Sequence, residues 1–206
     1  MLKTIPQRPY GMKIFVIDTG YAESDWLGHG TVVIDIIKYY NKEADIVSLS
    51  NTHNRTLTSV EMNLFYVLAN CTQNDILITP WNISKNSRID ELFAKISRKC
   101  KKIVCTAGNN REYKLDDWTP ARLTDYCDVI HCVKKSGDLA SFATQNKDTI
   151  GMYGTNVTCP DGVVRSGSTI SAAIYCGIVS RNSDQRFLRR VTRLIANKYQ
   201  SEISHA

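Results

Sequence analysis

Residues 13–40 read KIFVIDTGYAESDWLGHGTVVIDIIKYY, and this stretch decides the fold. The apolar run Lys13–Ile17 predicts a short buried strand that ends at Asp18. The segment Thr31–Tyr40 is apolar nearly all round, which predicts a buried helix that begins beside His29. A strand followed closely by a buried helix is the repeating unit of α/β proteins with a parallel sheet.

The alternation of strands and helices continues along the chain. Further strands are predicted at Asp45–Ser50, Asp75–Thr79, Lys102–Thr106 and Asp128–Val133. Further helices are predicted at Ser59–Asn70, Ile89–Cys100, Ser168–Val179 and Phe187–Tyr199. The pattern indicates an α/β fold, a three-layer αβα sandwich with a mostly parallel central sheet. We expect residues 1–12 to form an N-terminal extension and residues 13–206 to form one domain that ends in a basic helix.

The composition is that of an ordinary globular domain, with 206 residues, 43% hydrophobic residues, 22% charged residues and a net charge of +6. No stretch of the sequence approaches the ~18 apolar residues of a membrane span, and no nucleic-acid-binding motif accompanies the mild basic charge. Neither a membrane nor a nucleic acid is therefore an expected partner. The seven cysteines are an odd number and several lie in apolar runs, which indicates a reducing, cytoplasmic setting. No cluster with calcium-loop spacing appears, and we predict no metal and no cofactor.

Four short motifs follow one another in an order that is typical of acyl-transfer sites. They are Asp18-Thr19-Gly20, Gly28-His29-Gly30-Thr31, Ala107-Gly108-Asn109 and Ser166-Gly167-Ser168-Thr169. The first and third motifs follow predicted strands, and the second and fourth stand at predicted helix starts. Because the carboxyl ends of parallel strands gather at one edge of a sheet, we expect the four motifs to meet there.

Each motif contributes a side chain that amide hydrolysis requires. His29 is the candidate base, and Asp18 would hold its imidazolium form and fix its tautomer. Asn109 would donate a side-chain N–H to the oxyanion. A hydroxyl at the start of the Ser168–Val179 helix would be the nucleophile, because the positive end of a helix favours negative charge.

With these motifs the chain resembles the subtilisin-like (subtilase) proteases from about Lys13 to Gly177. The resemblance also covers Trp118-Thr119-Pro120-Ala121, Asp128-Val129-Ile130 and Ala140-Ser141-Phe142. It implies an α/β sandwich, endopeptidase activity, and a peptide or protein substrate bound in extended form across the site. It also implies that substrate-binding segments contain Gly108, Gly167, Trp81 and Asn82. Trp81 and Asn82 stand where the family has glycines, so Trp81 is expected either to line or close a specificity pocket or to be a core aromatic.

The nucleophile segment departs from the family pattern, in which Gly-Thr-Ser is followed by a glycine eight residues after the serine. Gly167 and Gly177 match the two glycines, so Thr169 falls at the serine position and Ser168 at the threonine position. One interpretation makes Thr169 the nucleophile of an intracellular endopeptidase. A second makes Ser168 the nucleophile after a shift of ~100° around the helix. In a third, the site is a natural or engineered inactive form, a pseudo-protease that binds peptides without cutting them.

Two further hypotheses concern other parts of the sequence. The Asp18-Thr19-Gly20 motif by itself would suit an aspartic protease, but that mechanism needs a second carboxylate and the chain has no second copy of the motif. The segment Ile5–Tyr10 contains two prolines, which favour an extended chain, and we hypothesise that it lies against the cleft.

Overall fold

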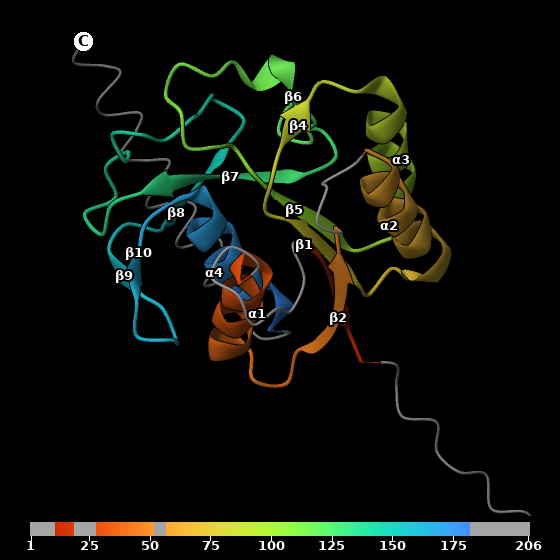
Figure 1. Cartoon of the computed structure of the whole chain (residues 1–206), viewed down its shortest axis with the longest axis horizontal. Helices are drawn as coiled ribbons and strands as arrows, with labels where there is room; N and C mark the ends of the chain where they lie inside the picture. The colour runs from red at the N-terminus through yellow and green to blue at the C-terminus, as the bar shows by residue number, and fades with distance from the viewer. Residues whose placement is uncertain (1–10, 19–27, 52–56, 182–206) are drawn as a thin grey trace, which may run out of the picture.

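A sheet of parallel strands forms the centre of the computed structural model, which describes residues 11–18, 28–51 and 57–181. Within these ranges the sheet has six strands in the order β2-β1-β3-β5-β7-β8 (Figure 1). They are β1 (Lys13–Asp18), β2 (Asp45–Ser50), β3 (Ile76–Thr79), β5 (Lys102–Thr106), β7 (Asp128–Val133) and β8 (Ile150–Tyr153). Each pairing between neighbouring strands is parallel, which confirms the predicted sheet.

Helices cover both faces of the sheet and complete the predicted three-layer αβα sandwich. One face carries α1 (His29–Tyr40) and α4 (Ser168–Ser180), and the other carries α2 (Leu57–Asn70) and α3 (Ser87–Ser97) (Figure 1). Successive side chains of a strand point to opposite faces. Ile14 and Val16 of β1 therefore join the apolar core beneath α1 and α4. Phe15 and Ile17 join the core beneath α2 and α3.

The helices α1 and α4 cross in close contact at Gly177. A Cβ atom at Gly177 would lie 2.8 Å from the Cβ of Tyr40 and 3.0 Å from the carbonyl oxygen of Ile37. Close-packed interiors leave no room for such an atom, so the contact requires glycine. The crossing sets the distance between the two helices whose first turns carry His29 and Thr169.

The predicted elements agree with the described ones to within three residues at each end, but several short elements had no prediction. They are β8, the antiparallel pair β4 (Ile83–Ser84) and β6 (Trp118–Thr119), the antiparallel pair β9 (Val157–Thr158) and β10 (Val164–Arg165), and the 3₁₀ turn η1 (Leu115–Asp117). The strand β8 contains only four residues, one of them Gly151, which weakens a strand signal. The predicted helix Phe187–Tyr199 and the segment Ile5–Tyr10 lie outside the described residues.

All seven cysteines are buried free thiols, which agrees with the apolar runs in which several of them lie. Burial raises the pKa of the Cys100 thiol to about 12, so this side chain is a neutral core residue at physiological pH. In the part of the chain that the structure describes, no helix is both long and apolar enough to cross a membrane.

Candidate active site

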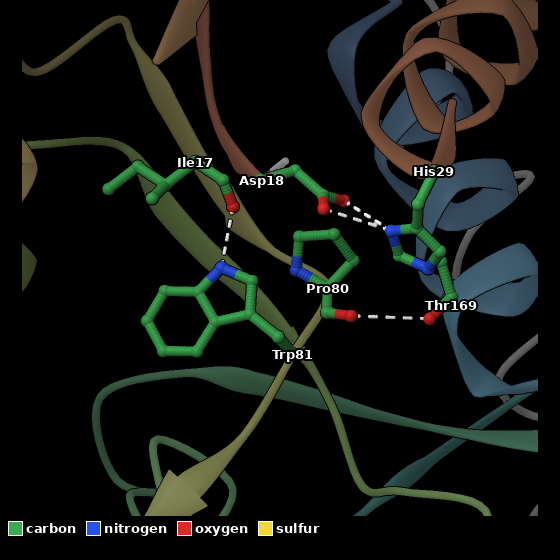
Figure 2. A network of polar contacts seen from close by, with 6 residues as sticks. All are labelled: Ile17, Asp18, His29, Pro80, Trp81 and Thr169. Carbon is green, nitrogen blue, oxygen red and sulfur yellow. Dashed lines mark hydrogen bonds and ion pairs between the residues drawn. The ribbon is translucent and has the colours of Figure 1, made fainter. Parts of the chain in front are cut away.

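Asp18 and His29 meet at the carboxyl edge of the sheet. Asp18 is the last residue of β1 and is 4% exposed, whereas His29 begins α1 with a side chain that is 43% exposed. The Nδ1 atom of His29 lies 2.9 and 2.8 Å from the two carboxylate oxygens of Asp18 (Figure 2). Because an ionised carboxylate only accepts hydrogen bonds, Nδ1 carries the proton and Nε2 is the proton acceptor of a neutral imidazole.

Thr169 is the second residue of α4. Its hydroxyl donates a hydrogen bond to the backbone carbonyl of Pro80 at 3.2 Å. Figure 2 shows the imidazole of His29 between the Asp18 carboxylate and the Thr169 side chain. The first backbone N–H groups of a helix have no acceptor within the helix, so the first turn of α4 offers hydrogen-bond donors beside the Thr169 hydroxyl.

The two hydroxyls that the sequence left as alternatives have different surroundings. Ser168 is 1% exposed, and its backbone N–H donates to Oδ1 of Asn109 at 2.8 Å. Thr169 is partly exposed and contacts Pro80, a residue of the cleft described below. Among the described residues, the Thr169 hydroxyl therefore hydrogen-bonds to a residue that lines the cleft of His29, whereas the Ser168 side chain is buried.

Asn109 follows β5 and presents its amide group to the turn before α4. Its Oδ1 accepts from the Ser168 N–H, which leaves the Nδ2 end as the donor. A Cβ at Gly167 would lie 3.2 Å from this Nδ2 atom, and Gly167 has a φ of +152° that side chains rarely adopt. Glycine at this position therefore lets the Asn109 amide lie close to the chain before Thr169, where it could donate to an oxyanion.

A cleft of about 280 Å³ opens beside Asp18 and His29. Its remaining lining residues are Asn51, Val60, Pro80, Trp81, Asn82 and Ile83. The indole N–H of Trp81 donates to the carbonyl of Ile17 at 2.6 Å, and the ring packs against the core beneath α2 and α3. Trp81 thus lines the cleft and also packs against the core, while its role in substrate specificity stays a prediction.

Asn82 and Gly108 lie together at the ends of β3 and β5. Nδ2 of Asn82 donates to the carbonyl of Thr106 at 2.9 Å and would lie 3.9 Å from a Cβ at Gly108. Oδ1 of Asn82 is buried and has no hydrogen-bond partner among the described residues. Gly108 has a φ of +114°, and a Cβ there would lie 3.1 Å from Oγ1 of Thr144. The backbone conformation and the close contact with Thr144 therefore explain why position 108 is a glycine. Its role in substrate binding stays a prediction.

The sequence could not identify the Pro80 carbonyl as the acceptor for the Thr169 hydroxyl, because a backbone acceptor does not depend on the residue type.

The other histidine that the structure describes does not line the cleft. His131 is buried in β7, where its Nδ1 lies 2.9 Å from Oγ1 of Thr149, and burial lowers its pKa to about 4. His53 and His205 lie outside the described residues. Nowhere in ranges 11–18, 28–51 and 57–181 do three His, Cys, Asp or Glu side chains gather as a metal site would need.

Comparison with solved structures identifies related folds. A cold-adapted subtilisin-like serine proteinase matches with a TM-score of 0.70 and 18% identity over 88% of this chain and 77% of that chain. A psychrophilic protease, S41, matches with a TM-score of 0.66 and 17% identity over 83% of this chain and 76% of that chain. A lanthipeptide protease matches with a TM-score of 0.63 and 13% identity over 82% of this chain and 72% of that chain.

Sequence comparison alone finds no relative: no protein-family model matches the chain, and no curated protein matches it. The likeness is therefore one of fold, and it covers more than four fifths of this chain in each of the three structures. The parallel sheet and its two pairs of helices agree with that likeness. The chain has the fold of the subtilisin-like proteases.

Proposed function

We propose that the chain is an endopeptidase that cleaves peptide bonds with Asp18, His29 and Thr169. The observation that carries the proposal is the His29 imidazole, which both oxygens of Asp18 hold in the cleft. The Thr169 hydroxyl donates to the carbonyl of Pro80, a residue that lines the same cleft. The fold that the chain shares with subtilisin-like proteases supports a peptide substrate. Its buried free cysteines support action in a reducing, intracellular compartment.

In the proposed reaction, Oγ1 of Thr169 attacks the carbonyl carbon of the scissile bond while its proton moves to Nε2 of His29. Nδ2 of Asn109 and a backbone N–H of the first α4 turn donate to the oxyanion. His29 then gives its proton to the leaving amine, and an acyl-enzyme ester remains on Thr169. A water molecule, deprotonated by His29, hydrolyses this ester and restores the hydroxyl.

Threonine makes the first step slower than serine would. The Thr169 hydroxyl donates to the Pro80 carbonyl, so this hydrogen bond must break and the hydroxyl must turn before its proton faces His29. A β-branched side chain has few favourable χ1 angles, and its methyl group crowds the attacked carbonyl. We therefore expect slow acylation, which suits an enzyme with few substrates.

The contact between Thr169 and Pro80 also favours a second candidate function, a pseudo-protease that binds extended peptides and does not cut them. In that case the hydroxyl stays bonded to the Pro80 carbonyl and the cleft serves recognition alone. The two candidate functions differ in one testable respect: only a peptidase needs a Thr169 hydroxyl that forms a covalent bond with the substrate carbonyl.

Intact mass after incubation with a fluorophosphonate probe tests the proposal on the full chain and on Thr169→Ala, Thr169→Ser, Ser168→Ala and His29→Ala. The proposal expects a slow adduct on the natural chain, a faster one on Thr169→Ser, and none on Thr169→Ala or His29→Ala. Ser168→Ala is the matched control, because it removes the neighbouring hydroxyl and should leave the adduct unchanged. An adduct on Thr169→Ser alone would support the pseudo-protease, and loss of the adduct in Ser168→Ala would contradict the assignment of Thr169.

A further inference from the structure

A second cavity, of about 510 Å³, lies against the turn that precedes Thr169. Ser166 of this turn lines it, together with Lys134 and Lys135 from the segment after β7. None of the residues that line the cavity is an aspartate or a glutamate. Neither lysine forms an ion pair with any residue that the structure describes. The cavity is therefore lined by two lysines and by no carboxylate.

The walls of this cavity are tied to the candidate nucleophile through the backbone. The N–H of Gly154 donates to the carbonyl of Val133 at 3.1 Å, and the N–H of Gly167 donates to the carbonyl of Gly154 at 2.9 Å. Val133 directly precedes the two lysines, and Gly167 lies two residues before Thr169. These bonds hold the lysine segment and the start of α4 in fixed relative positions.

Glycine at position 154 makes this arrangement possible. A Cβ at Gly154 would lie 2.0 Å from Oγ of Ser171 and 2.9 Å from the carbonyl oxygen of Gly167. The end of β8 can therefore approach α4 only without a side chain.

The lining suits a carboxylate on a short apolar stem. Beside the lysines lie the rings of Phe142 and Tyr153, which offer apolar contact to methylene groups. The backbone N–H of Asn156 donates to Oγ of Ser166 at 2.8 Å, and this bond orders the polar wall. The nearest carboxylate on the lysine turn, Asp138, accepts a hydrogen bond from the hydroxyl of Ser136 and does not line the cavity.

We propose that this cavity binds the side chain of an aspartate or glutamate in the same peptide that reaches Thr169. The inference rests on the proposed function in one respect, namely that the ligand is a peptide lying across the cleft. It adds a specificity: the preferred peptides carry an acidic residue at a fixed distance from the bond next to Thr169. Lys134 and Lys135 are the residues that select it, and attraction between exposed charges weakens as salt screens them.

Binding measured without turnover tests the inference. The protein is the full chain carrying Thr169→Ala, which cannot form an acyl-enzyme. Fluorescence anisotropy measures its affinity for labelled, C-terminally amidated decapeptides. At each position in turn, a peptide with Glu is compared with the same peptide carrying Gln there. We expect Glu to be preferred over Gln about tenfold at low ionic strength, at one or two adjacent positions only, with a loss of most of this preference in 0.5 M salt. The charge-reversed variant Lys134→Glu/Lys135→Glu should prefer Gln.

The matched control is Lys95→Glu/Lys101→Glu, which changes the net charge by the same amount at two exposed lysines that do not line the cavity. This control should keep the Glu preference, and thermal unfolding of both variants checks that they fold. Equal binding of Glu and Gln peptides would overturn the inference, as would a preference that survives reversal of Lys134 and Lys135. The titration is repeated with the same peptides carrying a free C-terminal carboxylate, and a Glu preference found only with those peptides would also overturn the inference. These outcomes are independent of the phosphonate experiment, because binding is measured on a variant that lacks the Thr169 hydroxyl.

Discussion

The substitution Gly177→Ala tests whether the α1–α4 crossing positions His29 relative to Thr169. The added Cβ would lie 2.8 Å from the Cβ of Tyr40 and 3.0 Å from the carbonyl oxygen of Ile37, whereas ordinary contacts begin at 3.4 Å. The two helices must therefore separate by about 0.6 Å at this point, because a packed interior has no free volume to absorb the methyl group. The shift is transmitted along both helices to their first turns.

Two opposing effects set the size of the stability change. Overpacking in a close-packed core costs about 2 kcal/mol, within a range of roughly 1–3 kcal/mol. Alanine is more favourable than glycine in a helix interior by about 1 kcal/mol. The net expectation is a loss of about 1 kcal/mol in the free energy of unfolding. Helix propensity alone would predict the opposite sign, a gain of about 1 kcal/mol.

Urea unfolding of the natural chain and of Gly177→Ala measures this difference. Gly11→Ala is the control, because a Cβ at Gly11 would have no atom within 4 Å, and it should change stability by less than about 0.5 kcal/mol. In a Thr169→Ser background, Gly177→Ala should also slow the fluorophosphonate reaction about tenfold, since misplacement of a base by a fraction of an ångström reduces reactivity. A stabilised Gly177→Ala protein that reacts at the unchanged rate would refute the reasoning.

Three further predictions concern buried polar groups. Asp75 is 3% exposed and accepts three hydrogen bonds at 2.7–2.8 Å, so Asp75→Asn should lower the unfolding free energy by about 2 kcal/mol in urea titrations. Trp81→Phe removes the donor to the Ile17 carbonyl and should cost about 1 kcal/mol by the same measurement, with a larger effect on peptide affinity. Burial lowers the pKa of His131 from 6.5 to about 4. Between pH 6.5 and pH 4, His131 is therefore protonated in the unfolded chain and neutral in the folded protein. The free energy of unfolding should therefore fall by about 3 kcal/mol as pH falls from 6.5 to 4. Urea denaturation at the two pH values measures this loss, and the His131→Gln variant should not show it.

Much of the fold could be predicted because buried parallel strands are nearly continuous apolar runs. In β1, Ile14 to Ile17 are each at most 1% exposed, and the same run is visible in the sequence. The helix α1 is apolar on most sides because its neighbour α4 covers part of its surface that would otherwise face water. The strand β8 could not be predicted, because Gly151 and a length of four residues leave no comparable pattern.

The polar parts of the candidate site could be predicted from the order of the motifs, but their connections could not. The Asp18–His29 pair follows from an aspartate at a strand end and a histidine at a helix start, both at the carboxyl edge. The bond between the Thr169 hydroxyl and the Pro80 carbonyl depends on how the chain after β3 turns. The lysine-lined cavity depends on hydrogen bonds between backbone groups of three separate segments, which residue types do not encode.

The contact at Gly177 also bears on which hydroxyl faces the cleft. Successive residues of a helix are ~100° apart, so bringing Ser168 to the place of Thr169 would rotate α4 by one residue. That rotation would bring Cys176 to the place of Gly177, where a Cβ would lie 2.8 Å from the Cβ of Tyr40. It would also break the bond from the Ser168 N–H to Asn109. The eight-residue spacing between Thr169 and Gly177 is therefore a packing requirement, and it keeps the Thr169 hydroxyl bonded to the Pro80 carbonyl.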